Sequence, residues 1–195
     1  MKLKINKITI GILGLGYVGL PLAIEFGKKY NVIGYDKNSK RIEELKRYND
    51  KNNEINKKSF FIAKKLKFTD DSKKLSKCNF YIVTVPTPIT RNKKPDLKMI
   101  KQSCLLIAKF IKKNDIVVFE STVYPGLTED FCAKLIEEKS SLKFNEDFFC
   151  GYSPERINPG DKNYTLTKIK KIVSGSNKDV TNIINKLYSS IITAG

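Results

Sequence analysis

The sequence contains no histidine, and none of its four cysteines stands in a CxxC pair. Structural zinc sites are built from paired cysteines and histidines, so the sequence predicts no metal site. Most of the cysteines lie in or beside apolar stretches, a position typical of buried thiols that stay reduced. Reduced thiols suit a cytoplasmic protein. The four cysteines are Cys78, Cys104, Cys132 and Cys150.

The chain also lacks an uninterrupted apolar run of membrane-spanning length. Its longest candidate covers residues 8–24 and follows three lysines, as the apolar part of a signal peptide would. Four glycines interrupt this run at spacings that an apolar helix does not need, and the run is too short and too rich in glycine to span a bilayer. We therefore expect neither a secreted protein nor a membrane protein.

Acidic residues are scarce beside basic ones: 20 Asp and Glu stand against 37 Lys and Arg, a formal net charge of +17. Such a charge raises the question of a nucleic-acid partner. The lysines are spread along the chain, without long runs of like charge and without interleaved aromatic residues. We read the charge as a solvated surface that can attract anionic dinucleotides, and expect no nucleic-acid partner. The alternative from another class is a basic nucleic-acid-binding module with a vestigial dinucleotide fold.

What the sequence does contain is an alternation of short apolar strands and helices over nearly its whole length. Parallel strands need crossover helices, so this pattern predicts an α/β fold: one doubly wound, mostly parallel Rossmann-type sheet with helices on both faces. Segment 51–65 has no clear pattern, and Asp96 is expected to be the N-cap of the third helix. We expect strands at 8–13, 31–35, 66–69, 80–85, 115–120, 148–151 and 171–174, and helices at 17–29, 39–48, 96–112, 126–138 and 179–192.

A GxGxxG pattern, formed by Gly14, Gly16 and Gly19, lies where the first expected strand passes into the first helix. This context indicates a dinucleotide site. Gly14 permits a tight turn, Gly16 lets the backbone approach a pyrophosphate, and Gly19 lets the helix pack closely on the strand. The N-terminus of that helix adds N–H groups and the positive end of its dipole.

Asp36 ends the second expected strand, about 17 residues after Gly19. An acidic residue here accepts hydrogen bonds from the adenine ribose hydroxyls and repels a 2′-phosphate, so NAD is favoured over NADP as cofactor. Lys37 and Arg41 are close enough in sequence to weaken that preference. The alternative is a strand–turn–helix unit with packing glycines and a solvated Asp36.

Three further segments, 84–88, 120–126 and 152–160, combine hydroxyl groups with prolines and follow expected strands. Ligands of open α/β sheets bind beyond the carboxyl ends of the strands. Taken singly, each segment is most simply an ordinary turn. Three of them at the same edge as a dinucleotide motif favour a binding site.

Together these segments resemble the UDP-glucose/GDP-mannose dehydrogenase family. The resemblance rests on four motifs and their spacing: GLGYVGLPLA at 14–23, VPTP at 85–88, ESTVYPG at 120–126 and YSPERINPGD at 152–161. The last motif and the residues at 169–175 are most similar to the branch that oxidises UDP-N-acetylhexosamines. A UDP-glucose 6-dehydrogenase is the alternative within the family, and a dehydrogenase of small hydroxy acids lies further off.

The resemblance implies a four-electron oxidation, in which the C6 alcohol of the sugar becomes a carboxylate and two NAD are reduced. It implies that Thr122 and Glu155 lie at the reacting centre, where Thr122 helps to position a water molecule. Arg156 and Ile157 would touch the sugar nucleotide. The residues implied in cofactor binding are Gly14, Gly16, Tyr17, Val18, Gly19, Asp36, Arg41, Pro86, Thr87 and Thr122.

The family's nucleophilic cysteine, its active-site lysine and asparagine, its central dimerisation helix and its UDP-binding domain all lie further downstream than residue 195. The resemblance therefore implies that residues 1–195 form the N-terminal NAD-binding domain. We expect this chain to bind NAD without turning over a UDP-sugar by itself. For the full-length protein we expect a homodimer that serves capsule or surface polysaccharide synthesis.

Overall fold

The computed structural model of the chain describes residues 5–155 and 166–194. Within these ranges the strands form one seven-stranded sheet in the order β3-β2-β1-β4-β5-β6-β7. All neighbouring strands are parallel except β6 and β7, which are antiparallel. The strands are β1 (Thr9–Leu13), β2 (Asn31–Tyr35), β3 (Leu66–Thr69), β4 (Phe80–Val83), β5 (Ile116–Phe119), β6 (Phe149–Tyr152) and β7 (Ser174–Gly175).

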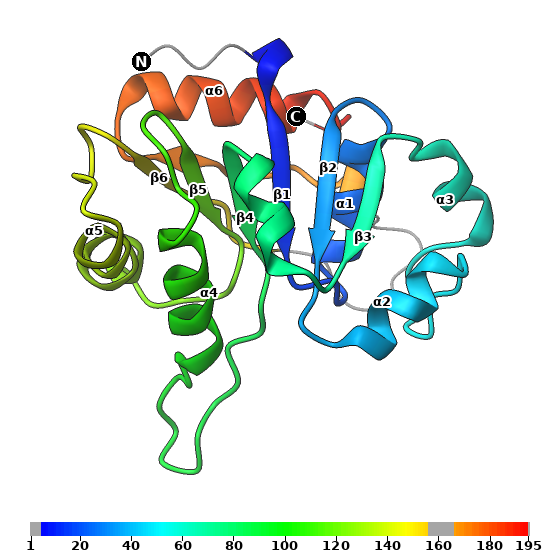
Figure 1. The fold of residues 1–195 in the computed structure, drawn as a ribbon, viewed down its shortest axis with the longest axis horizontal. Coiled ribbons are helices and arrows are strands. Elements are labelled where there is room, and N and C mark those ends of the chain that lie inside the picture. Colours follow the sequence, from blue (N-terminus) through cyan, green and yellow to red (C-terminus); the bar gives the residue numbers. More distant parts are fainter. Residues whose placement is uncertain (1–4, 156–165, 195) are drawn as a thin grey trace.

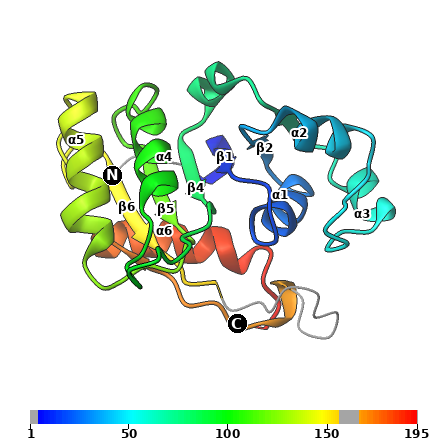
Figure 2. The ribbon, with the colours of Figure 1, turned by 90° about the horizontal axis from the view of Figure 1, so that it is seen from below.

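Helices cover both faces of this sheet (Figures 1 and 2). One face carries α1 (Gly19–Gly27) and α6 (Lys178–Ser189), and the other carries α4 (Lys98–Ala108) and α5 (Lys134–Ser140). Two further helices, α2 (Ser39–Lys46) and α3 (Lys57–Ile62), lie beside the β3 edge, at the right of Figure 1. The remaining turns of helix are η1 (Ile5–Lys7), η2 (Ser72–Lys77), the π-helix η3 (Leu127–Ala133) and η4 (Leu166–Lys168). The predicted doubly wound α/β fold is confirmed.

Each central strand divides its side chains between two hydrophobic cores. In β4, for example, Phe80 and Ile82 belong to the core under α1 and α6, whereas Tyr81 and Val83 belong to the core under α4 and α5. This alternation follows from the two-residue period of a strand. Because both faces are covered, the strand is apolar at every position, as expected for a parallel sheet.

The strand order reverses between β1 and β4, which is where an open α/β sheet binds its ligand. From β1 the chain continues to β2 and β3 on one side, and then returns to form β4 on the other side of β1. The carboxyl ends of the parallel strands meet at the lower edge of the sheet in Figure 1. Beyond β4, residues 86–97 run out from this edge and return to α4, closed by a bridge between Ile89 and Pro95 (Figure 1).

Several local predictions need correction. The first two turns of the helix predicted at 126–138 are the π-helix η3, which precedes α5. Residue Leu97, not Asp96, occupies the N-cap position of α4, although the Asp96 carboxylate does accept a hydrogen bond from the Lys98 N–H. The helix also ends at Ala108 rather than at residue 112. The unassigned segment 51–65 contains α3.

The strand predicted at 171–174 is wrong in most of its length, because β7 spans only Ser174–Gly175. The carbonyl oxygen of Ile172 accepts a hydrogen bond from the Ser153 hydroxyl, so residue 172 is tied to a side chain instead of a strand. Among the residues that the structure describes, no helix combines the length and the apolar character needed to cross a membrane.

Candidate functional site

The loop between β1 and α1 is shaped by Gly14 and Gly19. Gly14 has a φ of +96°, a conformation that side chains rarely adopt, and its N–H donates to the Tyr35 carbonyl oxygen over 2.9 Å. The loop then turns into α1 so tightly that a Cβ on Gly19 would lie 1.9 Å from the carbonyl oxygen of Gly14. The Thr84 hydroxyl, at the end of β4, donates to that same oxygen over 2.7 Å.

Gly16, at the exposed side of this loop, has a different environment. A Cβ on Gly16 would meet no atom within 4 Å. The loop therefore does not need glycine here for its own packing. An open position at the N-terminus of a helix lets an anionic group come close to main-chain N–H groups.

Asp36 links the glycine loop to the end of β2. One carboxylate oxygen accepts a hydrogen bond of 2.9 Å from the Leu15 N–H, and the other accepts one of 2.9 Å from the Asn38 N–H. These two bonds fix the plane of the carboxylate. A carboxylate oxygen can accept more than one hydrogen bond, so each still has capacity for a ligand hydroxyl.

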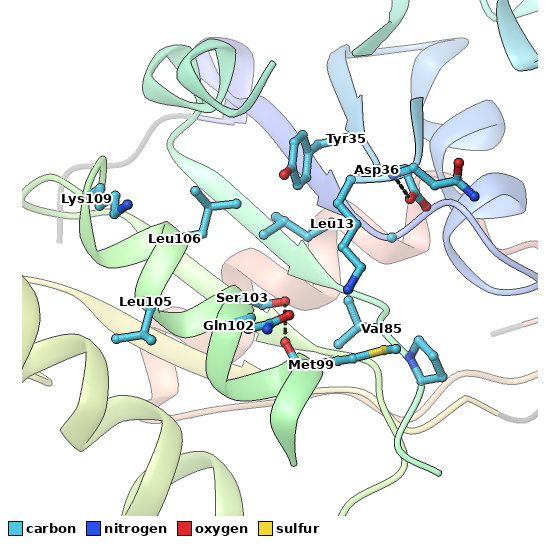
Figure 3. Close-up of a pocket in the computed structure, with 14 residues that line it drawn as sticks. Leu13, Tyr35, Asp36, Val85, Met99, Gln102, Ser103, Leu105, Leu106 and Lys109 are labelled. Carbon is cyan, nitrogen blue, oxygen red and sulfur yellow. Dashed lines mark hydrogen bonds between the residues drawn. The ribbon is translucent and has the colours of Figure 1, made fainter. Parts of the chain in front are cut away.

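Asp36 stands at the rim of a cavity of about 530 Å³ that opens between β1, β2 and α4. Figure 3 shows the apolar side chains of Leu13, Val85 and Leu106 facing this cavity, with Tyr35 near its upper end. Gly14 and Pro86 also line it. The cavity is thus an apolar pocket with a fixed carboxylate at its rim, a combination typical of small-molecule and cofactor sites.

Arg41, on α2, is bonded to the glycine loop and to two carboxylates. Its guanidinium donates to the Leu15 carbonyl oxygen over 3.0 Å, to Glu44 over 2.6 Å and to Asp50 over 2.7 Å. The Asp50 side chain is fully buried. Two carboxylates therefore neutralise the charge of Arg41, and the arginine stabilises the glycine loop through its hydrogen bond to the Leu15 carbonyl oxygen.

The segments that follow β4 and β5 are joined by side-chain hydrogen bonds. The Thr87 hydroxyl donates to the Thr122 carbonyl oxygen over 2.7 Å, and the Ser121 hydroxyl donates to the Val85 carbonyl oxygen. The Thr122 side chain is exposed, so its hydroxyl lies on the surface of this edge. The three hydroxyl residues thus hold two of the predicted loops side by side.

A buried charged cluster lies beyond the ends of β5 and β6. The ammonium group of Lys171 contacts the carboxylate of Glu120 and, at 3.0 Å, that of Glu155. The hydroxyl of Tyr188, on α6, donates to Glu120 over 2.5 Å. Burial raises the pKa of Glu120 to about 7, although Lys171 and the Tyr188 hydroxyl lower it. Burial also raises the pKa of Tyr188, with the Glu120 carboxylate acting in the same direction.

Residues 8–192 match a family described as the UDP-glucose/GDP-mannose dehydrogenase family, NAD binding domain. The chain belongs to this family. NAD is accordingly the cofactor of the domain. The cavity and the glycine loop are consistent with that match, because they lie at the strand-order reversal where such folds bind dinucleotides.

Relatives in the family carry names of nucleotide-sugar dehydrogenases. The chain is 51% identical over 191 residues to UDP-N-acetyl-D-glucosamine 6-dehydrogenase of Salmonella typhi. The matched region covers 98% of this chain and 45% of the relative. It is 47% identical over 187 residues to Protein CapL of Staphylococcus aureus, and this match covers 96% of this chain and 44% of CapL. A solved UDP-D-ManNAc dehydrogenase from Pyrococcus horikoshii superposes with a TM-score of 0.83 at 32% identity, over 95% of this chain and 45% of that one. The chain thus spans about half the length of these relatives.

The structure brings most of the predicted family site residues to one edge of the sheet. Gly14, Asp36 and Pro86 line the cavity, and Gly16 and Arg41 line a second hollow on the other side of Asp36. Tyr17 is half exposed. Val18 directly precedes α1 and packs against the core under α1 and α6. Gly19, Thr87 and Thr122 hold the loops as described above. Arg156 and Ile157 lie outside the described residues.

Sequence reasoning missed the buried cluster around Glu120. Glu120 is the first residue of the ESTVYPG motif at 120–126. An acidic residue directly after the wholly apolar strand β5 is a signal that could have marked it as a candidate site residue. Lys171 is one of several neighbouring lysines, and nothing in the sequence marks it as the one whose side chain is only 3% exposed. Tyr188 is recognisable only as an apolar position of α6.

Proposed function

We propose that this chain is the NAD-binding part of a nucleotide-sugar 6-dehydrogenase that oxidises the C6 alcohol of a UDP-N-acetylhexosamine to the uronic acid. The observation that carries the proposal is the Asp36 carboxylate, fixed by the Leu15 N–H at the rim of an apolar cavity beside the glycine loop. The names of the relatives support the choice of substrate, since the Salmonella typhi relative is a UDP-N-acetyl-D-glucosamine 6-dehydrogenase.

The residues fit an NAD molecule in a definite orientation. Asp36 would accept hydrogen bonds from the adenosine ribose, with the adenine in the cavity lined by Leu13, Val85 and Leu106. The pyrophosphate would lie against Gly16 and the N-terminus of α1, where the space beside Gly16 is open. Bound NAD supplies the hydride acceptor of the reaction.

A carboxylate at Asp36 also favours NAD over NADP, because it would repel a 2′-phosphate. Arg41 does not oppose this preference, since Glu44 and Asp50 already neutralise its charge. Lys37 lines the cavity and is a nearby cation that could weaken the discrimination.

At the reacting end of the site we propose that Thr122 and Glu155 serve the chemistry and that Arg156 and Ile157 contact the sugar nucleotide. Glu155 is an acid–base group beyond the carboxyl end of β6, and the exposed Thr122 hydroxyl can orient a water molecule. We further propose that residues 1–195 are the N-terminal NAD-binding domain of a longer cytoplasmic homodimer. Its product would serve capsule or surface polysaccharide synthesis.

Calorimetric titration of the chain with NAD and with NADP tests the cofactor site. We expect NAD to bind more tightly than NADP, and the Asp36→Ala variant to lose most of that preference. Glu43→Ala, which removes an exposed carboxylate from α2, is the matched control and should behave as the wild type. A folded chain that does not bind NAD, or whose NAD preference survives Asp36→Ala, would contradict the proposed site.

The same preparation tests the division of labour between this chain and the rest of the dehydrogenase. Incubated with NAD and a UDP-N-acetylhexosamine, the isolated chain should bind NAD but show no sustained formation of NADH. Continued turnover would show that this chain carries a complete catalytic site.

A further inference from the structure

We propose that Lys171 is a positioning residue, which holds the Glu155 carboxylate in place by linking it to Glu120. The inference rests on the proposed function in one respect, namely that Glu155 serves at the reacting centre. The sequence alone assigned no role to Lys171. What points to it is the buried cluster at the carboxyl ends of β5 and β6.

The geometry places one ammonium group between two carboxylates. Lys171 Nζ lies 3.0 Å from Glu155 Oε2 and also contacts Glu120 Oε2. The Lys171 side chain is only 3% exposed, the Glu120 side chain is fully buried, and the Glu155 side chain is 10% exposed. An ammonium has three N–H donors, so a single lysine can serve both carboxylates at once.

Glu120 is the fixed end of this arrangement. Its carboxylate accepts a hydrogen bond of 2.5 Å from Tyr188 in α6, and its main-chain N–H donates to the Val83 carbonyl oxygen over 2.9 Å. Glu120 is therefore held between β5, β4 and α6. Lys171 contacts both Glu120 and Glu155, and so links Glu155 to the fixed Glu120 carboxylate. Glu155 itself follows β6 in a segment without regular secondary structure.

The segment that bears Lys171 is itself tied to the end of β6. The Ser153 hydroxyl donates to the Ile172 carbonyl oxygen over 2.8 Å, and the Ser174 hydroxyl donates to the Tyr152 carbonyl oxygen over 3.2 Å. These bonds set residues 172–174 alongside residues 152–153. This arrangement brings Lys171 close to Glu155.

Burial favours a cation between the two carboxylates. Two carboxylates in a water-poor site repel each other, and a buried charge without a partner is costly. With the ammonium removed, Glu120 keeps its hydrogen bond from the Tyr188 hydroxyl, whereas Glu155, which is 10% exposed, loses the cation that links it to Glu120. An arginine at position 171 would keep the positive charge, but a methionine would not.

The first test measures how accessible the Glu155 carboxylate is in the 195-residue chain. Each variant is treated with a water-soluble carbodiimide and an amine, and the modification rate of Glu155 is followed by peptide mass spectrometry. We expect Glu155 of Lys171→Met to react about tenfold faster than in the wild type, and Lys171→Arg to restore most of the protection. Lys170→Met removes an exposed lysine one residue away and should change nothing.

Two controls separate a local effect from general loosening of the fold. The NAD affinity of each variant, measured by calorimetry, should equal that of the wild type, because Lys171 does not line the cofactor cavity. The fully buried Asp50 carboxylate should stay unmodified throughout. If Lys171→Met fails to fold, Lys171→Leu provides a second neutral variant without N–H donors.

The second test measures turnover after fusion of the chain to the part of the Salmonella typhi relative that lies beyond their match. We expect Lys171→Met to lower kcat about tenfold or more while KM for NAD stays within about twofold, with partial rescue by Lys171→Arg. An inactive fusion with wild-type Lys171 would count against the proposed function and not against the positioning role. Unchanged Glu155 protection in a folded Lys171→Met or Lys171→Leu chain would overturn the positioning role itself.

Discussion

Gly19 lies so close to Gly14 that a Cβ atom on Gly19 would come within 1.9 Å of the Gly14 carbonyl oxygen and 2.4 Å of the Thr84 hydroxyl oxygen. Gly16, in the same motif, has no atom within 4 Å of the corresponding position. The glycines of one motif are thus required for different reasons. Gly19 serves the packing of the protein, whereas Gly16 serves the approach of a ligand.

This difference predicts opposite effects of two alanine substitutions. Gly19→Ala should destabilise the chain by about 3 kcal/mol or more, because the clashing atoms belong to the backbone and to a buried threonine. Gly16→Ala should change the free energy of unfolding by no more than about 0.5 kcal/mol, yet weaken NAD binding about tenfold. Urea unfolding and calorimetry of both variants check the prediction, and a stable Gly19→Ala or an NAD affinity unaffected by Gly16→Ala would refute the respective half.

The Arg41 network predicts a second stability effect. Arg41→Ala removes the guanidinium that joins Glu44, the buried Asp50 and the Leu15 carbonyl oxygen. We expect a loss of about 3 kcal/mol in the free energy of unfolding, since Asp50 keeps main-chain donors but loses its cation. The matched control is Arg47→Ala, at the exposed end of α2, which should cost less than about 0.5 kcal/mol. Equal unfolding midpoints for the two variants would show that the network contributes little.

Local sequence patterns were sufficient to predict much of the fold. The strands expected at 31–35 and 66–69 match β2 and β3 at both ends, because polar residues bound both segments and leave little choice of where each strand begins and ends. The first helix begins at Gly19 and not at residue 17, since the glycine motif occupies the turn before it. The strand expected at 171–174 failed because its side chain at 171 and its carbonyl at 172 bond to groups distant in sequence.

The candidate site likewise has a part that the sequence predicts and a part that it does not. The glycine loop and Asp36 could be predicted because each requires a particular residue type at a fixed spacing. The cluster at Glu120 could not, because its members are 51 and 68 residues apart along the chain and only the folded sheet brings them together. A lysine is normally solvated, so its sequence position carries no sign that it is buried between two carboxylates.

The cysteines give a prediction about thiol reactivity. All four are free and buried, and burial raises the pKa of Cys78 to about 12. The pKa of Cys104 is raised by its hydrogen bond with Cys132 and by burial, and burial also raises that of Cys150. Because the thiolate is the reactive form, none should react with Ellman's reagent at neutral pH in the folded chain. All four should react after unfolding, and a rapid reaction of any one under native conditions would contradict this burial.

Glu120 predicts how stability depends on pH. Burial raises its pKa from the ordinary 4.5 to about 7 in the folded chain, so the folded state binds a proton that the unfolded state has already lost. The stabilisation from Glu120 is therefore complete below pH 4.5 and is lost as the pH rises through about 7. Over this window the loss should be on the order of 3 kcal/mol at most.

The comparison of wild type with Glu120→Gln isolates this contribution. Glutamine keeps an acceptor for the Tyr188 hydroxyl but cannot ionise, so the wild type should lose stability relative to the variant as the pH rises from 4.5 to about 7. Asp115, whose pKa is raised to about 6 by burial, acts with the same sign in both proteins and cancels in the difference. Urea unfolding at several pH values gives the measurement. Parallel stability curves would mean that the Lys171 ammonium offsets the burial of Glu120, and that the carboxylate is ionised throughout the window.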